Sequence, residues 1–437
     1  MAGHTASRQS DYRTARMDAL GDCQTSHTLS RVLKPTIVVI EILDHLHPTS
    51  IRVARALARP ESANLFLCHW HRLDFSGDKV AIQGTVHQVI SGGMVHRSSI
   101  TNPLPVDALF FYGPDSAELT ERDTPKLERL AAADIAVSGV PIYIIVDRMM
   151  LKASGRGVVT NALGSGRSWG PKHAQELKLR RYESATGEVI VRPKTYIARP
   201  HELRSVLARF SARGETCIVK PAFGEGGRGL SIVRRGDSFP QSNCTVVVQQ
   251  LIADPLLVDG HKADIRFYLL IDVDDQRSSG RLQPVFVRRA AEPYRAQSLC
   301  AEITNTSYRV RRGLPPDIRP LALTPGISRE LHTEIVSQLD SLANLLVKAY
   351  FWNAAQKLAN DAWPSVPNRL MLFGIDVLVA APSTVPQLYF LETNPFPALF
   401  RGSLECDQAV DEMLSREYLP VLIRSRSAAA AYPRYDN

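Results

Sequence analysis

Two carboxylates and one amide stand on what the sequence predicts to be a β-hairpin. The segments Gly374-Ile-Asp376 and Glu392-Thr-Asn394 flank a turn predicted at Pro382–Pro386. A turn there would set Asp376 opposite Glu392, with Cβ atoms ~5 Å apart, and Asn394 would share the face of Glu392. Adjacent carboxylates repel unless a cation lies between them, and hard oxygen ligands suit Mg²⁺. We therefore predict Asp376, Glu392 and Asn394 as metal ligands. The alternative, a coincidental acidic pair on a surface hairpin, is disfavoured by the apolar flanks.

Charged and apolar residues alternate in a second segment, Lys262-Ala-Asp264-Ile-Arg266-Phe. Side chains two positions apart in a strand share one face, so Lys262, Asp264 and Arg266 would line one wall of a polar site. Their apolar neighbours would pack behind them. The alternative is an exposed strand whose charges pair only with one another.

A third motif joins a strand that ends at Lys220 to a glycine-rich turn over residues 224–229. Glycines let backbone N–H groups approach a phosphate closely because no Cβ intervenes, and a lysine adds a point charge. No G-K-[ST] opens a helix here, so this is not a Walker loop. A glycine-rich hairpin can equally be structural. The predicted phosphate-binding residues are Lys220, Gly226, Gly227 and Arg228.

A fourth segment, Val246–Ile252, is a predicted strand with polar Gln249 near its end. A polar side chain beside free backbone groups is what the edge of an adenine base needs. The family resemblance described below implies that Gln249 and the main chain near Ile252 hold that base. Taken alone, the segment also reads as a plain buried strand.

The N-terminal part that precedes these motifs alternates strands and helices. Strands are predicted at Pro35–Ile40, Leu65–His69, Val106–Tyr112 and Val140–Val146, with a helix at Thr49–Leu57. Such alternation predicts a small α/β domain with a parallel sheet. No G-x-G-x-x-G follows the first strand, which argues against a dinucleotide site.

The remaining elements complete an α/β (α+β) fold. Further predicted elements are helices at His201–Phe210 and Ser328–Asn360, and strands at Thr216–Lys220, Leu230–Val233, Thr245–Gln250, Asp264–Ile271, Met371–Ala380 and Gln387–Glu392. We divide the chain into a disordered leader (1–33), an α/β domain (34–150), a linker and mobile loop (151–192), a lid subdomain (193–254), a C-terminal subdomain (255–425) and a tail (426–437).

Composition excludes several classes of protein. The 44% hydrophobic and 22% charged residues are ordinary for a globular chain. No apolar run reaches the ~18 residues of a membrane span, and the polar N-terminus indicates no signal peptide. Six scattered cysteines without a C-x-x-C pair argue against a disulfide scaffold or a zinc site. We expect a cytoplasmic protein that does not bind a membrane.

The formal charge of +8 comes from two basic stretches, residues 151–200 and 281–320. Such stretches can attract a nucleotide, an acidic peptide or a polyanion, or they can be a solvated basic face. Because no basic motif is interleaved with aromatic residues, we expect no nucleic-acid partner.

The order of the motifs resembles the ATP-grasp superfamily, and their wording resembles the tubulin–tyrosine ligase-like family. The matching segments are IVKPAFGEGGRG, VVQQLIADPLLVDGHKADIR, VRRAAEPY, ITN, LFGID and LETNP, within residues 216–398. The resemblance implies an ATP-grasp fold preceded by a pre-ATP-grasp parallel-sheet domain. It also implies ATP and two Mg²⁺ ions as cofactors.

The resemblance assigns a role to each matched residue. Arg266 would contact the γ-phosphate, and Arg288 would bind the acceptor or its activated carboxylate. Lys262 and Asp264 would lie near the ribose, and Asn305 belongs to the family's Thr-Asn element. Together with Lys220, these residues form the predicted catalytic and nucleotide-binding set.

The chain departs from the family pattern at three places. Gln250-Leu251 stands where the family commonly has Lys-Tyr, Ala263 replaces an aromatic residue, and Glu302 replaces a histidine. The N-terminal half is more similar to glutathione synthetase and the ribosomal-protein glutamate ligases. That similarity makes Lys178, 15 residues before Pro193, the second predicted ATP lysine, with Lys172 in reserve.

The resemblance implies an ADP-forming ligase that joins a carboxylate to an amine through an acylphosphate. Small-molecule or short-peptide substrates are expected, with a protein tail as in tubulin modification as an alternative. A phosphotransferase acting on a hydroxyl, or a binding module without activity, are the other readings. Replacing Asp376 or Glu392 by alanine is expected to abolish turnover and leave the fold intact.

Overall fold

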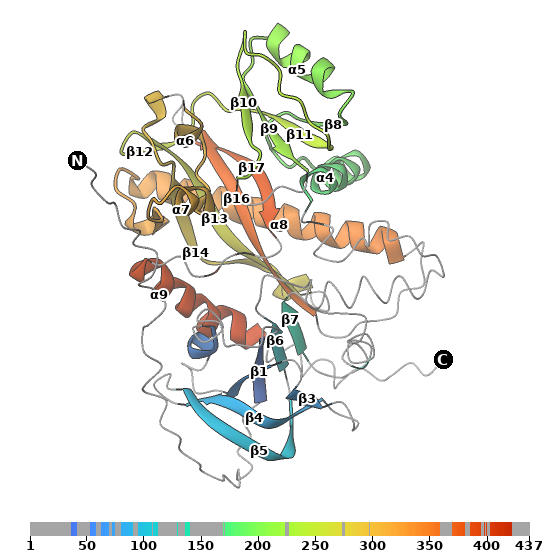
Figure 1. Ribbon diagram of the computed structural model, residues 1–437, viewed down its shortest axis with the longest axis vertical. Helices are drawn as coiled ribbons and strands as arrows, with labels where there is room; N and C mark the ends of the chain where they lie inside the picture. The colour runs from blue at the N-terminus through green and yellow to red at the C-terminus, as the bar shows by residue number, and fades with distance from the viewer. Residues whose placement is uncertain are drawn as a thin grey trace, which may run out of the picture.

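The computed structural model places its described strands in two sheets, one of 13 strands and one of four (Figure 1). The lower half of Figure 1 holds the N-terminal strands, the middle holds the long antiparallel strands, and the small sheet stands at the top. The residues that the structure describes are 36–41, 53–57, 63–69, 72–74, 80–90, 95–106, 108–111, 129, 136–139, 169, 171–222, 227–272, 276–296, 298–358, 369–380, 385–394, 397, 399 and 403–421.

Four N-terminal strands pair in parallel, which confirms the predicted parallel sheet. Their order is β2-β1-β6-β7, formed by β1 (Thr36–Glu41), β2 (Asn64–His69), β6 (Ala108–Phe111) and β7 (Ala136–Gly139). Residues 53–57 are helical, inside the predicted Thr49–Leu57 helix. The strand predicted at Val140–Val146 lies outside the described residues, as do the leader and the tail.

An antiparallel hairpin that was not predicted extends this sheet. It consists of β4 (Ala81–Val89) and β5 (Val95–Pro105), with the short β3 (Leu73–Asp74) on the other side of β4. β5 has no buried residue, and its sequence VHRSSITNPLP lacks the apolar alternation that marks a half-buried strand. The hairpin could therefore not be predicted from the alternation of apolar residues.

The middle of the molecule is an antiparallel sheet with the order β15-β14-β13-β16-β17. Its strands are β13 (His261–Asp272), β14 (Gly280–Arg289), β15 (Ile318–Pro320), β16 (Arg369–Ala380) and β17 (Gln387–Asn394), and β12 (Leu257–Val258) also pairs with β13. β16 also pairs in parallel with β7, through Arg369↔Val137 and Leu370↔Ser138. The N-terminal and central strands are thus one continuous sheet.

Helices cover both faces of the central sheet. The long α8 (Arg329–Leu358) packs against one face, where Ile265, Phe267 and Ile375 share a core with Ile335 and Leu339. The opposite face carries Tyr268 and Leu270 of β13 and is covered by α9 (Leu404–Met413) and the π-helical turn Leu414–Tyr418. The alternation along β13 therefore buries both faces of the strand, as expected for a central strand. Shorter helical turns are α6 (Leu299–Glu302), α7 (Thr306–Arg311), η6 (Gln276–Ser278), η7 (Tyr294–Ala296) and η8 (Leu321–Leu323).

The four-stranded sheet forms a small unit of its own, which we call the lid. Its order is β10-β9-β11-β8, formed by β8 (Thr195–Ala198), β9 (Cys217–Pro221), β10 (Ser231–Val233) and β11 (Val246–Gln250). Helix α5 (Leu203–Ala212) packs against it through Leu207 and Phe210. β9 and β10 are antiparallel, as the strand–turn–strand motif predicted.

Helix α4 (Lys172–Thr186) occupies part of the segment that was grouped with a linker. It lies between the lid and the central sheet (Figure 1). Its buried residues include Gln175, Glu176 and Lys178 beside Leu179 and Tyr182. Because polar residues occupy much of the buried face, the apolar stripe that announces a helix is missing.

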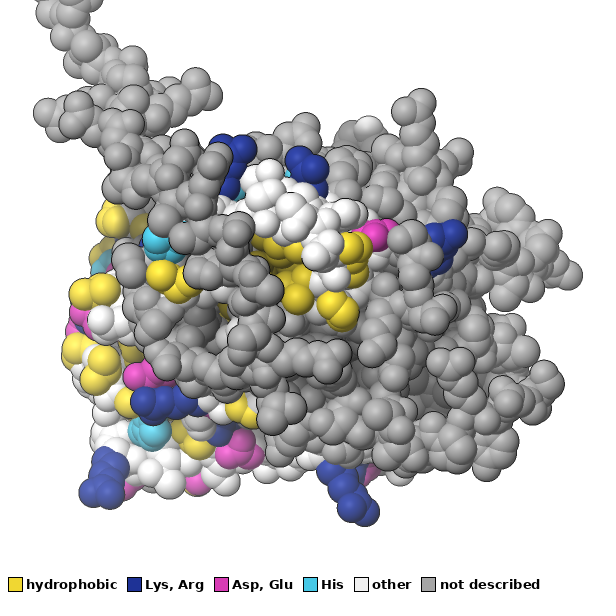
Figure 2. Space-filling model, turned by 90° about the horizontal axis from the view of Figure 1, so that it is seen from below, with side chains coloured by type: hydrophobic (Ala, Val, Ile, Leu, Met, Phe, Trp, Pro, Cys, Tyr) yellow, Lys and Arg dark blue, Asp and Glu magenta, His cyan; other side chains and the backbone are white. Residues whose placement is uncertain are grey.

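Figure 2 shows the molecule from below, the side on which Figure 1 places the N-terminal strands. Among the described side chains on that face, basic and acidic groups are interspersed and do not gather by sign. No helix among the described residues is long and apolar enough to span a membrane. Strands, helices and the N-terminal parallel sheet together confirm the predicted α/β (α+β) class.

Candidate active site

The hairpin β16–β17 has the register that its turn predicted. Asp376 pairs with Glu392 and Gly374 pairs with Asn394, and a bulge follows between Asp376 and Val377. Bulges often occur beside functional sites, where they redirect a side chain. The three oxygen-bearing residues predicted as metal ligands therefore lie together at one end of the hairpin.

Four charged residues form a buried cluster on three adjacent strands. We call Asp264, Arg266, Arg288 and Asp376 the core charge cluster. Strand pairing sets Asp264 opposite Arg288 and Arg266 opposite Asp376. All four are 2–3% exposed. The alternative of an exposed, self-paired strand is therefore wrong for Asp264 and Arg266.

Hydrogen bonds link the core charge cluster into one network. Arg288 donates from Nε to Asp264 Oδ1 (2.8 Å) and from Nη2 to Asp264 Oδ2 (2.5 Å), and its Nη2 also lies 3.0 Å from Asp376 Oδ1. Arg266 donates from Nη2 to Asp376 Oδ2 (2.8 Å) and from Nε to Oδ1. Thr304 adds a hydroxyl donor to Asp264 Oδ2 at 2.6 Å. Each charge is thus compensated by a partner of opposite sign.

Burial and pairing act on the cluster's pKa values in opposite directions. Burial alone would raise the pKa of Asp376, but Arg266 and Arg288 hold it well below its ordinary value. Burial alone would lower the pKa of Arg288, but Asp264 and Asp376 raise it above its ordinary value. Asp376 and Arg288 therefore stay charged over the physiological pH range.

One donor of the core charge cluster has no partner. Among the described residues, Nη1 of Arg266 is buried and makes no hydrogen bond. A Cβ added to Gly374 would lie 2.9 Å from this nitrogen and 2.9 Å from Cβ of Pro397. Only glycine leaves room for the guanidinium there, and an orphaned buried donor indicates a ligand acceptor.

Lys262 pairs with Glu302, the residue that stands where the family pattern has a histidine. Lys262 Nζ donates to Glu302 Oε2 at 2.8 Å, and both side chains are 5% exposed. A carboxylate in place of the family's histidine thus neutralises this buried lysine.

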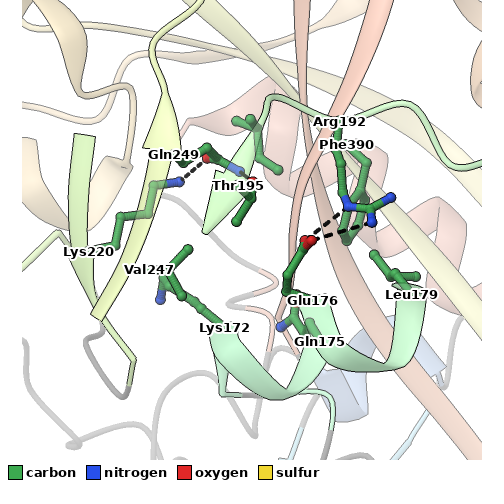
Figure 3. Close-up of a pocket in the computed structure, with 11 residues that line it drawn as sticks. Lys172, Gln175, Glu176, Leu179, Arg192, Thr195, Lys220, Val247, Gln249 and Phe390 are labelled. Atoms are coloured by element: carbon green, nitrogen blue, oxygen red, sulfur yellow. Dashed lines mark hydrogen bonds and ion pairs between the residues drawn. The ribbon is translucent and has the colours of Figure 1, made fainter. Parts of the chain in front are cut away.

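A small pocket opens between the lid, α4 and β17 (Figure 3). Lys220 Nζ donates to Gln249 Oε1 at 2.7 Å, and Gln249 Nε2 donates to Thr195 Oγ1 at 3.1 Å. Burial lowers the pKa of Lys220 to about 8, with Lys172 and Lys262 adding to the effect and Glu392 opposing it. The structure therefore brings together the lysine and the glutamine predicted for phosphate and adenine. The lining residues are Lys172, Gln175, Glu176, Leu179, Arg192, Thr195, Lys220, Val247, Gln249, Phe390 and Leu391.

Lys178 is not among the residues that line this pocket. It is 3% exposed, and its Nζ lies 5.0 Å from the ring centroid of Trp169. Lys172 lines the pocket instead, and its Nζ lies 3.4 Å from Glu392 Oε2. The spacing that favoured Lys178 counted residues along a helix without knowing which of its faces meets the lid.

The other predicted nucleotide residues lie outside this pocket's lining. Gly226 lies outside the described residues. Gly227 has a φ of 77° and faces Tyr308, and Arg228 is exposed. Ile252 is half-buried. Asn305 caps α7, where its side chain accepts a hydrogen bond from Ser307 N at 2.9 Å.

The donor set on the hairpin fits a hard cation. Asp376, Glu392 and Asn394 offer oxygen atoms, which Mg²⁺ prefers, and Glu392 keeps 23% of its side chain exposed. Within the described part of the chain, no group of three His, Cys, Asp or Glu residues could hold a metal. The set on the hairpin consists of two carboxylates and one amide, so the third ligand would be the side-chain oxygen of Asn394.

Sequence reasoning missed the polar groups that α4 contributes. Glu176 accepts from Arg180 Nε (2.6 Å) and Arg192 Nε (2.9 Å), and Glu183 accepts from Arg192 Nη2 (2.8 Å). Burial opposes the charge of Arg192, yet Glu183 and Glu176 raise its pKa above the ordinary value. An i,i+4 Glu–Arg pair within 176–180 was the one local signal of this helix.

Comparison with known proteins agrees with the geometry. The tubulin-tyrosine ligase family model matches residues 171–428, more than half of the chain. Tubulin polyglutamylase TTLL7 of Homo sapiens is 38% identical over 80 residues, which are 18% of this chain and 9% of that protein. Tubulin polyglutamylase TTLL13 of Homo sapiens is 32% identical over 127 residues, 28% of this chain and 15% of that protein. The matched segments are a small part of each relative. The family model covers more than half of the chain and therefore decides the assignment. This chain belongs to the tubulin-tyrosine ligase family, which has an ATP-grasp fold.

Proposed function

We propose that this protein is an ATP-dependent ligase that joins an amino acid to a carboxylate on a protein tail, with release of ADP and phosphate. The observation that carries the proposal is the unpartnered Nη1 of Arg266, buried beside Gly374 and the oxygen ligands of the hairpin. A buried cationic donor next to hard oxygen ligands suits a phosphate that arrives with its metal ion.

ATP would lie between the lid (residues 193–254) and the central subdomain (residues 255–425). Gln249 would hold the adenine edge, and Lys220 and Lys172 would hold phosphates. The contact of Lys220 with Gln249 and the pairing of Lys172 with Glu392 support this placement, because both lysines face one pocket. Lys172 takes the role that spacing had given to Lys178.

Asp376, Glu392 and Asn394 would hold Mg²⁺, which supplies charge neutralisation at the phosphates. Asp376 is already shared by Arg266 and Arg288, so it fixes both guanidinium groups as well. Arg266 would donate its open Nη1 to the γ-phosphate. Arg288 would stabilise negative charge near the acceptor carboxylate through its fixed position.

The chemistry would run in two steps. The acceptor carboxylate attacks the γ-phosphorus, ADP leaves, and an acylphosphate forms. The amine of the incoming amino acid then attacks the acyl carbon, an amide forms, and phosphate leaves with the amine losing a proton. In both steps the protein positions the groups and offsets charge, as is general for phosphoryl transfer.

The protein-tail acceptor is supported by the relatives. The matched relatives are tubulin polyglutamylases, a name that describes addition of glutamate to a protein. We accordingly propose a glutamate-rich tail as acceptor and glutamate as donor. The small-molecule or short-peptide substrate expected from the N-terminal half becomes the second arm of the test.

The test measures ADP release from Mg²⁺–ATP with each amino acid, alone and with either tubulin or a glutamate-rich peptide, and the mass of every product. A product heavier than the acceptor by one amino-acid residue, formed only with both substrates, is expected. A phosphorylated product would instead establish a phosphotransferase. Absence of nucleotide binding would overturn the proposal.

A further inference from the structure

The outer edge of β17 is held by a side chain where a neighbouring strand would normally lie. Among the described strands, β17 pairs only with β16. Phe390 N, before the bulge, donates to Val191 O at 2.9 Å. Beyond the bulge, the backbone of Thr393 is met by the side-chain amide of Gln175 from α4.

Both polar atoms of the Gln175 side-chain amide make hydrogen bonds to the backbone. Its Oε1 accepts from Thr393 N at 2.9 Å, and its Nε2 donates to Thr393 O at 2.7 Å and to Trp169 O. Gln175 is 3% exposed and Thr393 is 5% exposed. A flipped amide would set its oxygen against two carbonyl oxygens, so its orientation is fixed.

The two bonds to Thr393 act on the two predicted metal ligands that flank it. Thr393 N belongs to the peptide group that follows Glu392, and Thr393 O belongs to the peptide group that precedes Asn394. Because these two peptide planes carry the ligand-bearing residues, holding both planes fixes where Glu392 and Asn394 project. In the same helical turn, Lys172 contacts the carboxylate of Glu392 at 3.4 Å.

We propose that Gln175 is a positioning residue that sets Glu392 and Asn394 for the divalent cation. This inference rests on the proposed function, because it assumes that the hairpin binds a metal with nucleotide. Outer partners that orient metal ligands typically contribute about 10- to 100-fold to metal affinity. Both polar atoms of its amide are bonded to backbone groups, so the side chain would act on the cation through Glu392 and Asn394.

The test measures Mn²⁺ binding to the full chain with a nonhydrolysable ATP analogue, by the electron paramagnetic resonance signal of free Mn²⁺. Nucleotide binding is measured separately in the presence of a chelator. Gln175→Met removes both bonds to Thr393 at nearly constant volume. Because Gln175 also lines the pocket, the metal-free measurement corrects for any change in nucleotide affinity, and beyond that change we expect the Mn²⁺ affinity to fall about 10- to 100-fold.

A matched control is a glutamine that bonds the backbone just before β17 begins. Gln338 of α8 donates from Nε2 to Pro386 O at 2.8 Å, at the far end of β17 from the predicted ligands. Gln338→Met removes the same kind of bond, and its Mn²⁺ affinity should equal that of the wild type. Gln175→Glu keeps the shape and the acceptor but loses the donor to Thr393 O, so it should also weaken Mn²⁺ binding.

The outcomes separate the two ideas. Equal Mn²⁺ affinity in Gln175→Met, Gln175→Glu and the control would overturn the positioning role and leave the ligase proposal standing. A wild-type chain that binds no Mn²⁺ with nucleotide would overturn both. Thermal unfolding identifies a misfolded Gln175→Met, in which case the isosteric Gln175→Glu decides the question.

Discussion

The core charge cluster and the lid pocket differ in how far their charges are already satisfied. In the cluster, Asp264, Arg266, Arg288 and Asp376 are almost fully buried and bound to one another. In and beside the pocket, Lys220 and Glu392 are partly exposed; Lys220 donates to Gln249, and Glu392 pairs with Lys172.

This difference indicates which groups contribute to both stability and activity, and which contribute to activity alone. Removing one member of a buried ion network leaves an uncompensated charge and strongly destabilises the fold. A partly exposed pair is screened by water and contributes little to stability. Substitutions in the cluster should therefore change folding and activity together, whereas those in the pocket should change activity alone.

Asp376→Asn is expected to have the largest effect on folding. The neutral amide leaves Arg266 and Arg288 with less negative charge, so the free energy of unfolding should fall by about 3–5 kcal/mol. Urea unfolding measures it. This corrects the expectation that replacing Asp376 leaves the fold intact, since the residue is buried between two arginines.

The control for this variant is Asp340→Asn. Asp340 Oδ1 pairs with Arg281 Nε at 2.7 Å, and the Asp340 side chain is 53% exposed although that of Arg281 is 5% exposed, so this variant tests the exposure of the carboxylate. The expected loss is below about 1 kcal/mol. Equal losses in the two variants would remove the distinction between buried and exposed pairs.

Gly374→Ala is expected to cause the next largest loss of stability. The new Cβ would lie 2.9 Å from both Arg266 Nη1 and Pro397 Cβ, so one of them must move, at a cost of about 1–3 kcal/mol. Thermal unfolding and ADP release report the two consequences. Gly280→Ala on β14 has open space around its Cβ and should lose no stability; a similar loss there would show that the effect comes from the strand and not from Arg266.

Glu392→Gln should lower activity while leaving the free energy of unfolding nearly unchanged. Its partner Lys172 and Glu392 itself are 17% and 23% exposed in their side chains, so unfolding should change by less than about 1 kcal/mol. Activity should fall by about 10²- to 10³-fold, the usual cost of losing one electrostatic group in a site. A fully active Glu392→Gln would refute its assignment as a metal ligand.

The pH dependence of ATP binding gives the smallest effect. With its pKa lowered to about 8, Lys220 is protonated below that pH and loses its charge above it. ATP affinity should therefore fall by up to about tenfold between pH 7 and pH 9, since each pH unit above the pKa removes most of the remaining charge. Lys220→Arg keeps its charge over this range, so its ATP affinity should not vary. An identical slope in both proteins would place the titrating group elsewhere.

Counting residues through a turn predicted the pairing of Asp376 with Glu392 but could not have predicted the pairing of Asp264 with Arg288. The turn at Pro382–Pro386 set Asp376 opposite Glu392, and the structure agrees. Counted from the pairs next to η6, such as Tyr268 with Leu282, Asp264 would face Phe286, but a register shift between Arg266 and Tyr268 sets it opposite Arg288. Arg288 was therefore assigned from the family resemblance, because a bulge cannot be counted from the sequence.

The contributions of α4 could not be predicted in this way. Gln175, Glu176 and Lys178 face inward on a helix whose burial is polar, so periodicity gives no sign of which face meets the lid. The choice between Lys172 and Lys178 depends on that face. Contacts such as Gln175 with Thr393 join residues far apart in the chain, and no spacing rule reaches them.

Helix α4 also touches both sides of the pocket through its backbone and side chains. Lys172 N donates to Ala222 O and Arg180 Nη2 donates to Thr195 O, both in or beside lid strands, while Gln175 holds β17. A helix that is bonded to both bodies makes their ligand equilibria thermodynamically linked. If nucleotide binding shifts the lid against α4 and thereby raises metal affinity by some factor, the metal must raise nucleotide affinity by that same factor.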